Sequence, residues 1–312
     1  MGESRNAKDS RSAGQVPGAP DSRGIGDIRA AVEEAVAGEP RPLNEAEFQH
    51  IRRLAHSHFG LDLKEGKQAL VMARLGKSMR REGFRSYEQY CRHVEADTTG
   101  QALAELGDAL TTNFTSFLRE PAHFDFLRST VFPELAGRRS VEIWSAACST
   151  GEEPYSILFT ALEKLAPGVD VRIVATDIST RALEAARRAT YQAERTQGLP
   201  EEWLRRYFLK GSGEWEGWLR LKTEYRARVQ TRRFNLISDP LPPAHFPVVF
   251  CRNVMIYFDK ATQAAVVRRL SAALEPEGYL MIGHAESLAG VEHDLEYVKP
   301  AIYRKPGWRD GR

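Results

Sequence analysis

The chain has 312 residues, of which 42% are hydrophobic and 28% are charged, a balance typical of a folded protein with a sizeable core. The formal net charge of +2 creates no strong overall field, so charge alone indicates neither nucleic acid nor a membrane surface as a partner. Cys91, Cys148 and Cys251 show no disulfide or metal-ligand spacing, and no apolar run approaches the roughly 20 residues that span a bilayer. We therefore expect a cytoplasmic protein without a metal site.

The N-terminal third divides into a tail and a helical unit. Residues 1–42 are rich in Gly, Ser, Ala, Pro and charge, and they bury too little apolar surface to offset the entropy lost on ordering, so we predict a disordered tail. Apolar residues then recur at helical spacing behind the cap candidate Asn44, with Glu47 three residues later. This pattern predicts an all-α unit over 43–110, followed by a linker over 111–134.

One predicted helix of this unit, about residues 64–81, carries a basic flank beside its apolar face. At 100° per residue, four cations fall within roughly a quarter-turn arc. They are Lys67, Arg74, Lys77 and Arg81. A solvated helix face explains such a flank, and a binding surface for an acidic partner is the alternative.

Residues 135–307 alternate between apolar runs and amphipathic helices. The apolar runs cover 141–146, 171–176, 248–251 and 279–282, and helices are predicted over 152–165, 180–189 and 260–274. Buried strands that alternate with helices are typical of a parallel, doubly wound sheet. The segment 190–233 breaks this rhythm, and its glycines around an alternating run at 218–222 predict an inserted small antiparallel sheet.

The turn after the first strand, SAACSTGEEPYS at 145–156, predicts a ligand site. Its small residues let a ligand approach the backbone, and the helix that follows directs free N–H groups toward that space. Glu152 and Glu153 follow Gly151 where a phosphate-binding loop requires Lys and a hydroxyl residue. Because acids repel phosphate, the turn favours a cationic or amino-bearing ligand.

Asp177 ends the second predicted strand. An acid at this place can accept both hydroxyls of a ribose, although Asp177 could equally be the N-cap of the following helix. Read with the acidic turn, it favours a nucleoside that carries a positive sulfonium and an amino-acid tail, which is S-adenosylmethionine.

Cys148 raises a competing hypothesis of thiol catalysis. A cysteine nucleophile needs a base within hydrogen-bond reach, for which His123, His245 and His284 are candidates. None of them falls in a thiol-enzyme motif. A small buried residue that packs the pocket is the interpretation we favour.

Two further segments carry a family resemblance, TTNFTSFLRE at 111–120 and FCRNVMIYF at 250–258. With AACSTGEEPYS, ATDIS, FNL at 234–236 and GHAESL at 283–288, in matching order, they resemble the motifs of the chemotaxis receptor methyltransferases, the CheR family. The resemblance covers roughly residues 43–305. Leu118 stands where an aromatic residue is usual, and Cys148 where an alanine is common.

The resemblance implies a Rossmann-like class I S-adenosylmethionine-dependent methyltransferase fold with an N-terminal all-α domain and an inserted β-subdomain. It implies methyl transfer to receptor glutamates, giving glutamyl methyl esters and S-adenosyl-L-homocysteine. Arg119 and Tyr257 would be catalytic, with Glu153 an open alternative to Glu152 among the cofactor contacts. The implied cofactor-binding residues are Asn113, Thr115, Arg119, Glu152, Asp177, Asn235, Leu236, Arg252 and Asn253.

The resemblance also implies partners. Chemoreceptor methylation helices are acidic, and the basic flank Lys67, Arg74, Lys77 and Arg81 would contact them. The β-subdomain resembles one that in some members grips a receptor C-terminal peptide, although an excursion without a partner is an alternative. An S-adenosylmethionine-binding signalling module without turnover is the main competing function. A nucleic-acid methyltransferase is disfavoured, because Arg252-Asn253-Val254 stands where amino-directed base methylation uses an Asp-Pro-Pro-Tyr type sequence.

Overall fold

The structure is a computed structural model that describes residues 40–307. The tail predicted for residues 1–42 lies almost entirely outside the described residues. Within the described range, no helix is long and apolar enough to cross a membrane.

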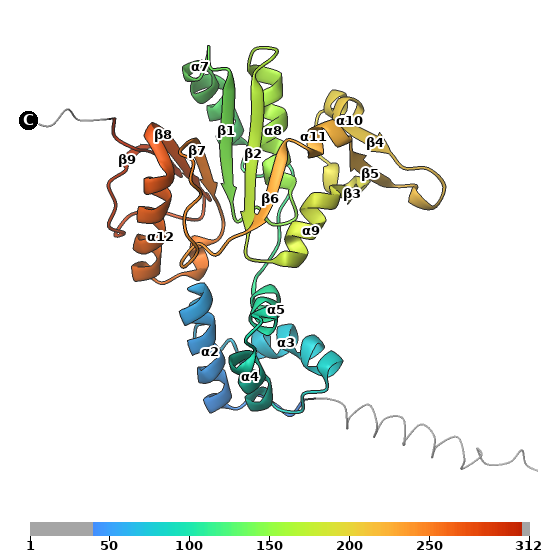
Figure 1. Ribbon diagram of the computed structural model, residues 1–312, viewed down its shortest axis with the longest axis vertical. Helices are drawn as coiled ribbons and strands as arrows, with labels where there is room; N and C mark the ends of the chain where they lie inside the picture. Colours follow the sequence, from blue (N-terminus) through green and yellow to red (C-terminus); the bar gives the residue numbers. More distant parts are fainter. Residues whose placement is uncertain (1–39, 308–312) are drawn as a thin grey trace, which may run out of the picture.

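Four helices form the N-terminal unit (Figure 1). They are α2 (Glu45–Phe59), α3 (Gln68–Glu82), α4 (Tyr87–Ala96) and α5 (Gln101–Leu110). Asn44 Oδ1 accepts the backbone N–H of Glu47 at 2.9 Å, and the Glu47 carboxylate accepts the N–H of Asn44 at 3.1 Å. This reciprocal capping box confirms the cap read from the sequence, because it depends only on residues three apart.

The remaining chain is built on a seven-stranded sheet of order β6-β2-β1-β7-β8-β10-β9. The first five strands in this order run parallel, whereas β10 pairs antiparallel with both β8 and β9. The doubly wound fold predicted from the sequence is confirmed. The strands are β1 (Ser140–Ala146), β2 (Asp170–Asp177), β6 (Val229–Arg233), β7 (Phe246–Cys251), β8 (Leu274–Ile282), β9 (Glu296–Lys299) and β10 (Ile302–Arg304).

Helices cover both faces of this sheet. Adjacent side chains of β1 point to opposite faces, so Ile143 packs with the cluster of α8 and Trp144 with the cluster of α12. The α8 face carries α6 (Pro121–Phe126), the π-helix η1 (Leu127–Val131), α7 (Phe132–Glu134), α8 (Glu152–Lys164) and α9 (Thr180–Arg188). The other face carries α12 (Lys260–Ala273), which shares its core cluster with the N-terminal unit.

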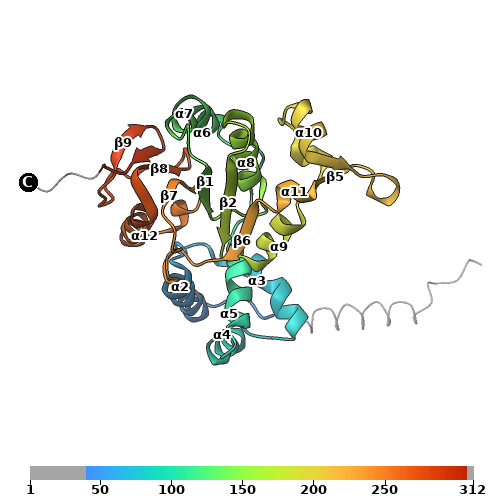
Figure 2. The same ribbon diagram turned by 45° about the horizontal axis from the view of Figure 1, so that its top comes forward.

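A small antiparallel sheet of order β3-β5-β4 projects beside α9 (Figure 2). The segment that forms this sheet contains β3 (Thr190–Gln192), η2 (Ala193–Thr196), α10 (Glu201–Tyr207), β4 (Phe208–Lys210), η3 (Gly213–Trp215), β5 (Trp218–Leu221) and α11 (Thr223–Arg226). The insertion predicted over 190–233 is too long at its end, because β6 pairs with β2 in the main sheet. The sequence of β6, VQTRR, is that of a polar edge strand, so it lacks the apolar run that marks the buried strands.

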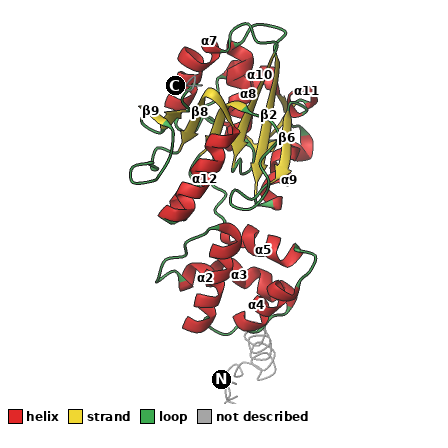
Figure 3. Ribbon diagram, turned by 60° about the vertical axis from the view of Figure 1, so that its left-hand side comes forward, coloured by secondary structure: helices red, strands yellow, loops and turns green. Residues whose placement is uncertain are grey.

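The N-terminal unit lies across the end of the main sheet at which the parallel strands finish (Figure 3). Two backbone contacts join the parts, since the N–H of Asp62 donates to the carbonyl of Tyr257 at 2.8 Å and Leu61 forms a β-bridge with Phe258. Asn235 Nδ2 also donates to the carbonyl of His58 at 2.6 Å. The space at the carboxyl ends of the strands is thereby roofed by helices.

Candidate functional site: a roofed cavity at the carboxyl ends of the strands

A cavity with about 930 Å³ of empty space, part of it open to solvent, lies between the N-terminal unit and the strand ends. Phe59 and Leu110 line it from the helical side. The predicted site residues that line it are Asn113, Thr115, Arg119, Asp177, Asn235, Leu236, Arg252, Asn253 and Tyr257. Segments far apart in the sequence therefore meet at one place, where a doubly wound sheet binds its ligands.

The turn between β1 and α8 forms one wall. Ala147 and Ser149 adopt left-handed backbone conformations, with φ of 68° and 50°. Gly151, at φ 101°, has no room for a side chain, since a Cβ there would lie 2.8 Å from the Tyr191 hydroxyl. The chain thus turns sharply between strand and helix and presents backbone, with little side chain, to the cavity.

Asp177 lies beside this turn, and 7% of its surface is exposed. Its carboxylate accepts the backbone N–H of Ser149 at 2.8 Å and of Ser179 at 2.9 Å. The alternative that Asp177 caps α9 is wrong, because the Ser179 hydroxyl accepts the N–H of Ala182 and is the N-cap. Burial raises the pKa of Asp177, against the lowering effect of these N–H groups. Asp177 also lines the cavity, where carboxylate oxygens can accept hydroxyl groups.

The two glutamates that begin α8 face different partners. Glu153 lines the cavity and accepts the Ser145 hydroxyl at 2.7 Å. Glu152 is fully buried, accepts the Thr150 hydroxyl at 2.7 Å and forms an ion pair with Arg195 of the small sheet. Of the two alternatives for the cofactor contact, Glu153 lines the cavity and Glu152 does not, so the geometry favours Glu153.

Arg252 joins three parts of the site. It follows β7 directly, with 5% of its surface exposed, and it pairs with Glu120 at 2.9 Å and with Glu153 at 3.1 Å. The same guanidinium donates to the carbonyl of Arg119 at 2.5 Å. Two carboxylates compensate this one buried cation, so Arg252 contributes no uncompensated positive charge to the wall. Burial raises the pKa of Glu153, and Arg252 opposes that shift.

Arg119 lines the cavity and is partly exposed. Its guanidinium donates to the carbonyl of Phe114 at 2.9 Å and lies 5.7 Å from the centre of that ring, which is 75% exposed. Within residues 40–307, no carboxylate forms an ion pair with Arg119. Its remaining N–H donors are free to bind a carboxylate that enters from solvent.

Asn235 and Leu236 form the wall at the end of β6. The Asn235 side chain donates to His58, as described, and accepts the N–H of Ile237 at 3.1 Å, so it holds the loop against α2. Leu236 lines the cavity with Ile178 and Phe234, and this apolar surface fits the faces of a planar base.

Cys148 lies behind the turn with 1% of its surface exposed. Burial raises the pKa of its thiol well above the ordinary value, and the acids around it add to that effect. Its Sγ contacts the carbonyl of Ser149. A thiolate nucleophile is disfavoured at this position, and the side chain acts as packing.

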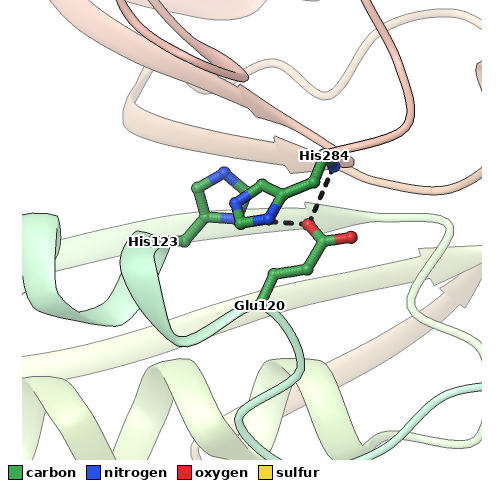
Figure 4. Close-up of side chains that lie close together, drawn as sticks. All are labelled: Glu120, His123 and His284. Atoms are coloured by element: carbon green, nitrogen blue, oxygen red, sulfur yellow. Dashed lines mark hydrogen bonds and ion pairs between the residues drawn. The ribbon is translucent and has the colours of Figure 1, made fainter.

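Glu120, His123 and His284 form a cluster whose possible ligand atoms lie within 4.8 Å of one another (Figure 4). His123 is fully buried, and burial with the nearby Arg252 lowers its pKa to about 3, so the ring is neutral near pH 7. Glu120 already pairs with Arg252 and accepts the backbone N–H of His284 at 3.1 Å. Because a metal ion here would compete with the guanidinium, we assign the cluster to the Arg252 network.

The basic flank of α3 divides into two kinds of residue. Arg74 donates to the carbonyl of Leu110 and to the hydroxyl of Thr112, and Arg81 pairs with Glu82 and Glu105. Lys67 and Lys77 are exposed and form no ion pair within residues 40–307. Lys67 and Lys77 are thus the exposed cations of this flank that form no ion pair within the described residues, whereas Arg81 is exposed but paired and Arg74 anchors the segment that enters the cavity.

Sequence reasoning missed Glu120 and Glu286 as parts of this site. Glu286 accepts backbone N–H groups of Asn253, Met255 and Ile256. Glu120 lies in the motif at 111–120 and Glu286 in the motif at 283–288, and membership in these motifs was the sequence feature that could have identified them. Most of their partners lie at least 30 positions away, so only the fold identifies what they hold.

The strand order, the acid at the end of β2 and the roofed cavity define an S-adenosylmethionine-dependent methyltransferase. Asp177 suits the ribose, the apolar wall suits adenine, and Glu153 suits the cationic end, so the residues present fit this cofactor. The model of the CheR methyltransferase SAM-binding domain matches residues 113–303, and that of its all-alpha domain matches residues 46–111. The chain belongs to the CheR methyltransferase family.

Named relatives are similar over most of the chain. A chemotaxis protein methyltransferase 2 of Pseudomonas aeruginosa is 39% identical and covers 82% of this chain and 92% of its own. The chemotaxis protein methyltransferase of Escherichia coli is 38% identical and covers 84% of this chain and 91% of its own. That of Borreliella burgdorferi is 35% identical and covers 83% of this chain and 94% of its own. A solved glycopeptide N-methyltransferase with S-adenosylmethionine is 16% identical over 62% of this chain and 68% of its own, with a TM-score of 0.35.

Proposed function

We propose that this chain methylates glutamate side chains on the cytoplasmic helices of chemoreceptors. The protein would then act in the cytoplasm, and the glutamyl methyl esters would serve sensory adaptation. The observation that carries the proposal is that Asp177, which we assign to the nucleoside, lines the same cavity as Arg119 and Tyr257. The Arg119 guanidinium has further N–H donors that can bind the substrate carboxylate, which the reaction requires to be held in place. The similarity to named chemotaxis methyltransferases supports the class of receptor substrate.

The reaction asks mainly for positioning. S-adenosylmethionine supplies an electrophilic methyl group on a sulfonium. A substrate glutamate, with an ordinary pKa of about 4.3, is already ionised near pH 7, so the protein needs no general base. Arg119 orients the incoming carboxylate, and Tyr257 lines the cavity where the methyl is transferred. Because a tight ion pair would also stabilise the ground state, Arg119 must hold the carboxylate without neutralising it fully.

The roof contributes by keeping water out. Phe59, Leu110 and Phe258 line the cavity with apolar side chains. Attack of a carboxylate on a sulfonium neutralises two charges, and a site with little water favours that change. The N-terminal helical unit therefore takes part in the chemistry as well as in receptor contact.

The experiment that tests the function uses methyl-labelled S-adenosylmethionine and a chemoreceptor cytoplasmic fragment. We expect label on the receptor fragment that base releases as methanol, because glutamyl methyl esters are labile in base. Cofactor binding without transfer to any receptor would favour the alternative, a binding module that signals without turnover. Label that survives base would indicate N- or C-methylation and would exclude the ester.

We further propose that α3 faces the acidic receptor helices through Lys67 and Lys77, with Arg74 and Arg81 supporting them. Their exposure supports this assignment. Electrostatic attraction of this kind speeds association and weakens as salt rises.

A receptor C-terminal peptide is the partner we propose for the small sheet. The outer edge of β4 borders a groove lined by Leu209, Trp215 and Trp218, of which Leu209 is 54% and Trp215 is 60% exposed. An open strand edge beside exposed apolar side chains suits strand addition by an extended peptide. Titration of the protein with receptor C-terminal peptides tests this, and Trp215→Ala should abolish the binding. Binding that survives the change would place the peptide elsewhere.

A further inference from the structure

Glu286 lies behind the loop that carries Arg252, Asn253 and Tyr257, and the proposed chemistry gives it no task. It follows β8 in the segment GHAESL, and 9% of its surface is exposed. Within residues 40–307, no Lys or Arg forms an ion pair with it. A buried carboxylate without a cation is costly unless hydrogen bonds compensate its charge.

Backbone N–H groups provide that compensation. Glu286 Oε1 accepts the N–H of Met255 at 2.8 Å and of Ile256 at 3.3 Å. Its Oε2 accepts the N–H of Asn253 at 2.9 Å and of Gly283 at 2.5 Å. Three of the four donors belong to the loop after β7, where only the single 3-10 turn η4 (Met255–Tyr257) is regular structure. The Glu286 side chain thus satisfies backbone N–H groups that would otherwise be paired within a strand or a helix.

We infer that Glu286 is a positioning residue for methyl transfer, which sets the conformation of the loop that presents Arg252, Asn253 and Tyr257 to the cavity. Asn253 shows why such a residue is needed. Its φ of 58° lies in the left-handed region, which a non-glycine residue adopts at a cost unless its surroundings hold it. Glu286 holds its backbone, while Glu120 accepts its side-chain Nδ2 at 3.2 Å.

Gly283 supports the same inference independently. A Cβ at Gly283 would lie 2.4 Å from Asn253 Nδ2, 2.9 Å from the Asn253 backbone nitrogen and 2.8 Å from Glu286 Oε2. The φ of Gly283 is not in the left-handed region, so space rather than backbone conformation requires glycine here. The loop after β7 and the loop after β8 therefore fit together only with a bare backbone at this point.

The inference rests on the proposed function for its activity readout, so the test also measures cofactor binding. Glu286→Gln keeps the volume but replaces one acceptor oxygen with an N–H₂ donor that faces backbone N–H groups. We expect kcat for methyl transfer to fall by about 10- to 100-fold, since a displacement of about 1 Å is enough for such a loss. We also expect calorimetry to show weaker binding of S-adenosyl-L-homocysteine, because Arg252 and Asn253 lie on the same loop.

Asp97→Asn is the matched control. Asp97 also accepts backbone N–H groups, of Thr99 at 2.9 Å and Ala102 at 2.7 Å, but it lies at the start of α5, the end remote from the cavity. It should lower the unfolding temperature and leave kcat and S-adenosyl-L-homocysteine affinity unchanged. Folded Glu286→Gln protein that behaves like this control would overturn the inference.

Gly283→Ala gives a second test, which does not depend on Glu286→Gln folding well. We expect the same loss of kcat and of affinity, and a double variant that loses little more than either single one, because both changes displace one loop. Additive losses would mean that the two residues act separately and would contradict the inference. If the unaltered protein binds S-adenosyl-L-homocysteine but does not methylate receptor, the proposed function fails, and the calorimetric comparison still decides the role of Glu286.

Discussion

The backbone N–H of Ser149 lies 2.8 Å from Asp177 Oδ2, so the carboxylate that ends β2 holds the turn that ends β1. These strands are parallel neighbours, and their carboxyl ends lie side by side. The same acid therefore shapes one wall of the cavity and offers its lone pairs to it. A change at Asp177 should affect the ligand twice, through a lost contact and through a displaced turn.

Asp177→Asn should weaken binding of S-adenosyl-L-homocysteine by about 10- to 100-fold, the usual effect of losing a hydrogen bond to a charged group. Calorimetric titration measures this directly. Asp170→Asn is the matched control, because Asp170 begins the same strand at the end away from the cavity, where it pairs with Arg172 on the surface. Equal affinities for the two variants would remove Asp177 from the cofactor site.

Arg119→Ala should lower kcat by about 100-fold and change cofactor affinity little, because Arg119 faces the incoming carboxylate. Steady-state methylation of a receptor fragment, with calorimetry for the cofactor, separates the two effects. Arg128→Ala removes a surface cation that pairs with Asp125, and it should behave like the unaltered protein. Lost affinity with an intact kcat would mean that the roles of Arg119 and Asp177 are exchanged.

Lys77→Glu and Arg74→Glu should differ in their salt dependence. Lys77 is exposed, so its reversal should slow receptor methylation by about threefold at low salt and have little effect at high salt. Arg74 holds Leu110 and Thr112, both of which line the cavity, so its reversal should lower the rate at every salt concentration. Lys164→Glu, at the far end of α8, makes the same charge change away from the site. Rates that stay unchanged for both variants at low salt would end the steering hypothesis.

Acid should weaken the hydrogen bonds of two carboxylates that accept backbone N–H groups at the starts of helices, Asp97 before α5 and the N-cap Asp259 of α12. The hydroxyl of Thr99 and the N–H of Ala102 lower the pKa of Asp97 to about 2, and the N–H of Thr262 with His56 lowers that of Asp259 to about 2. A carboxylate whose folded-state pKa is depressed contributes stability above its unfolded pKa of about 4, and that contribution is lost as pH falls toward 2. Unfolding temperatures of Asp97→Asn and Asp259→Asn should lie below that of the unaltered protein at pH 6 and converge with it near pH 2. A difference that stays constant with pH would contradict this origin.

Local and periodic features of this protein were predictable from sequence. The capping box of Asn44 and Glu47 depends on residues three apart, the buried strand β7 is a continuous apolar run, and β1 is rich in apolar residues. The edge strand β6 was predicted as part of the insertion, because its polar sequence has no such apolar run. The motifs predicted which segments form the site, since each follows a strand or precedes a helix.

The alternation of buried strands and helices, the family and the segments around the cavity were predictable from the amino-acid sequence, because hydrophobic period and short motifs are local properties. Which side chains face the cavity depends on tertiary packing. Glu152 and Glu153 are neighbours, and since successive residues on a helix point about 100° apart, the rotation of α8 against the sheet turns one to Arg195 and the other to Arg252. Arg74 and Glu286 likewise act on backbone more than 30 residues away, and packing alone brings those partners together.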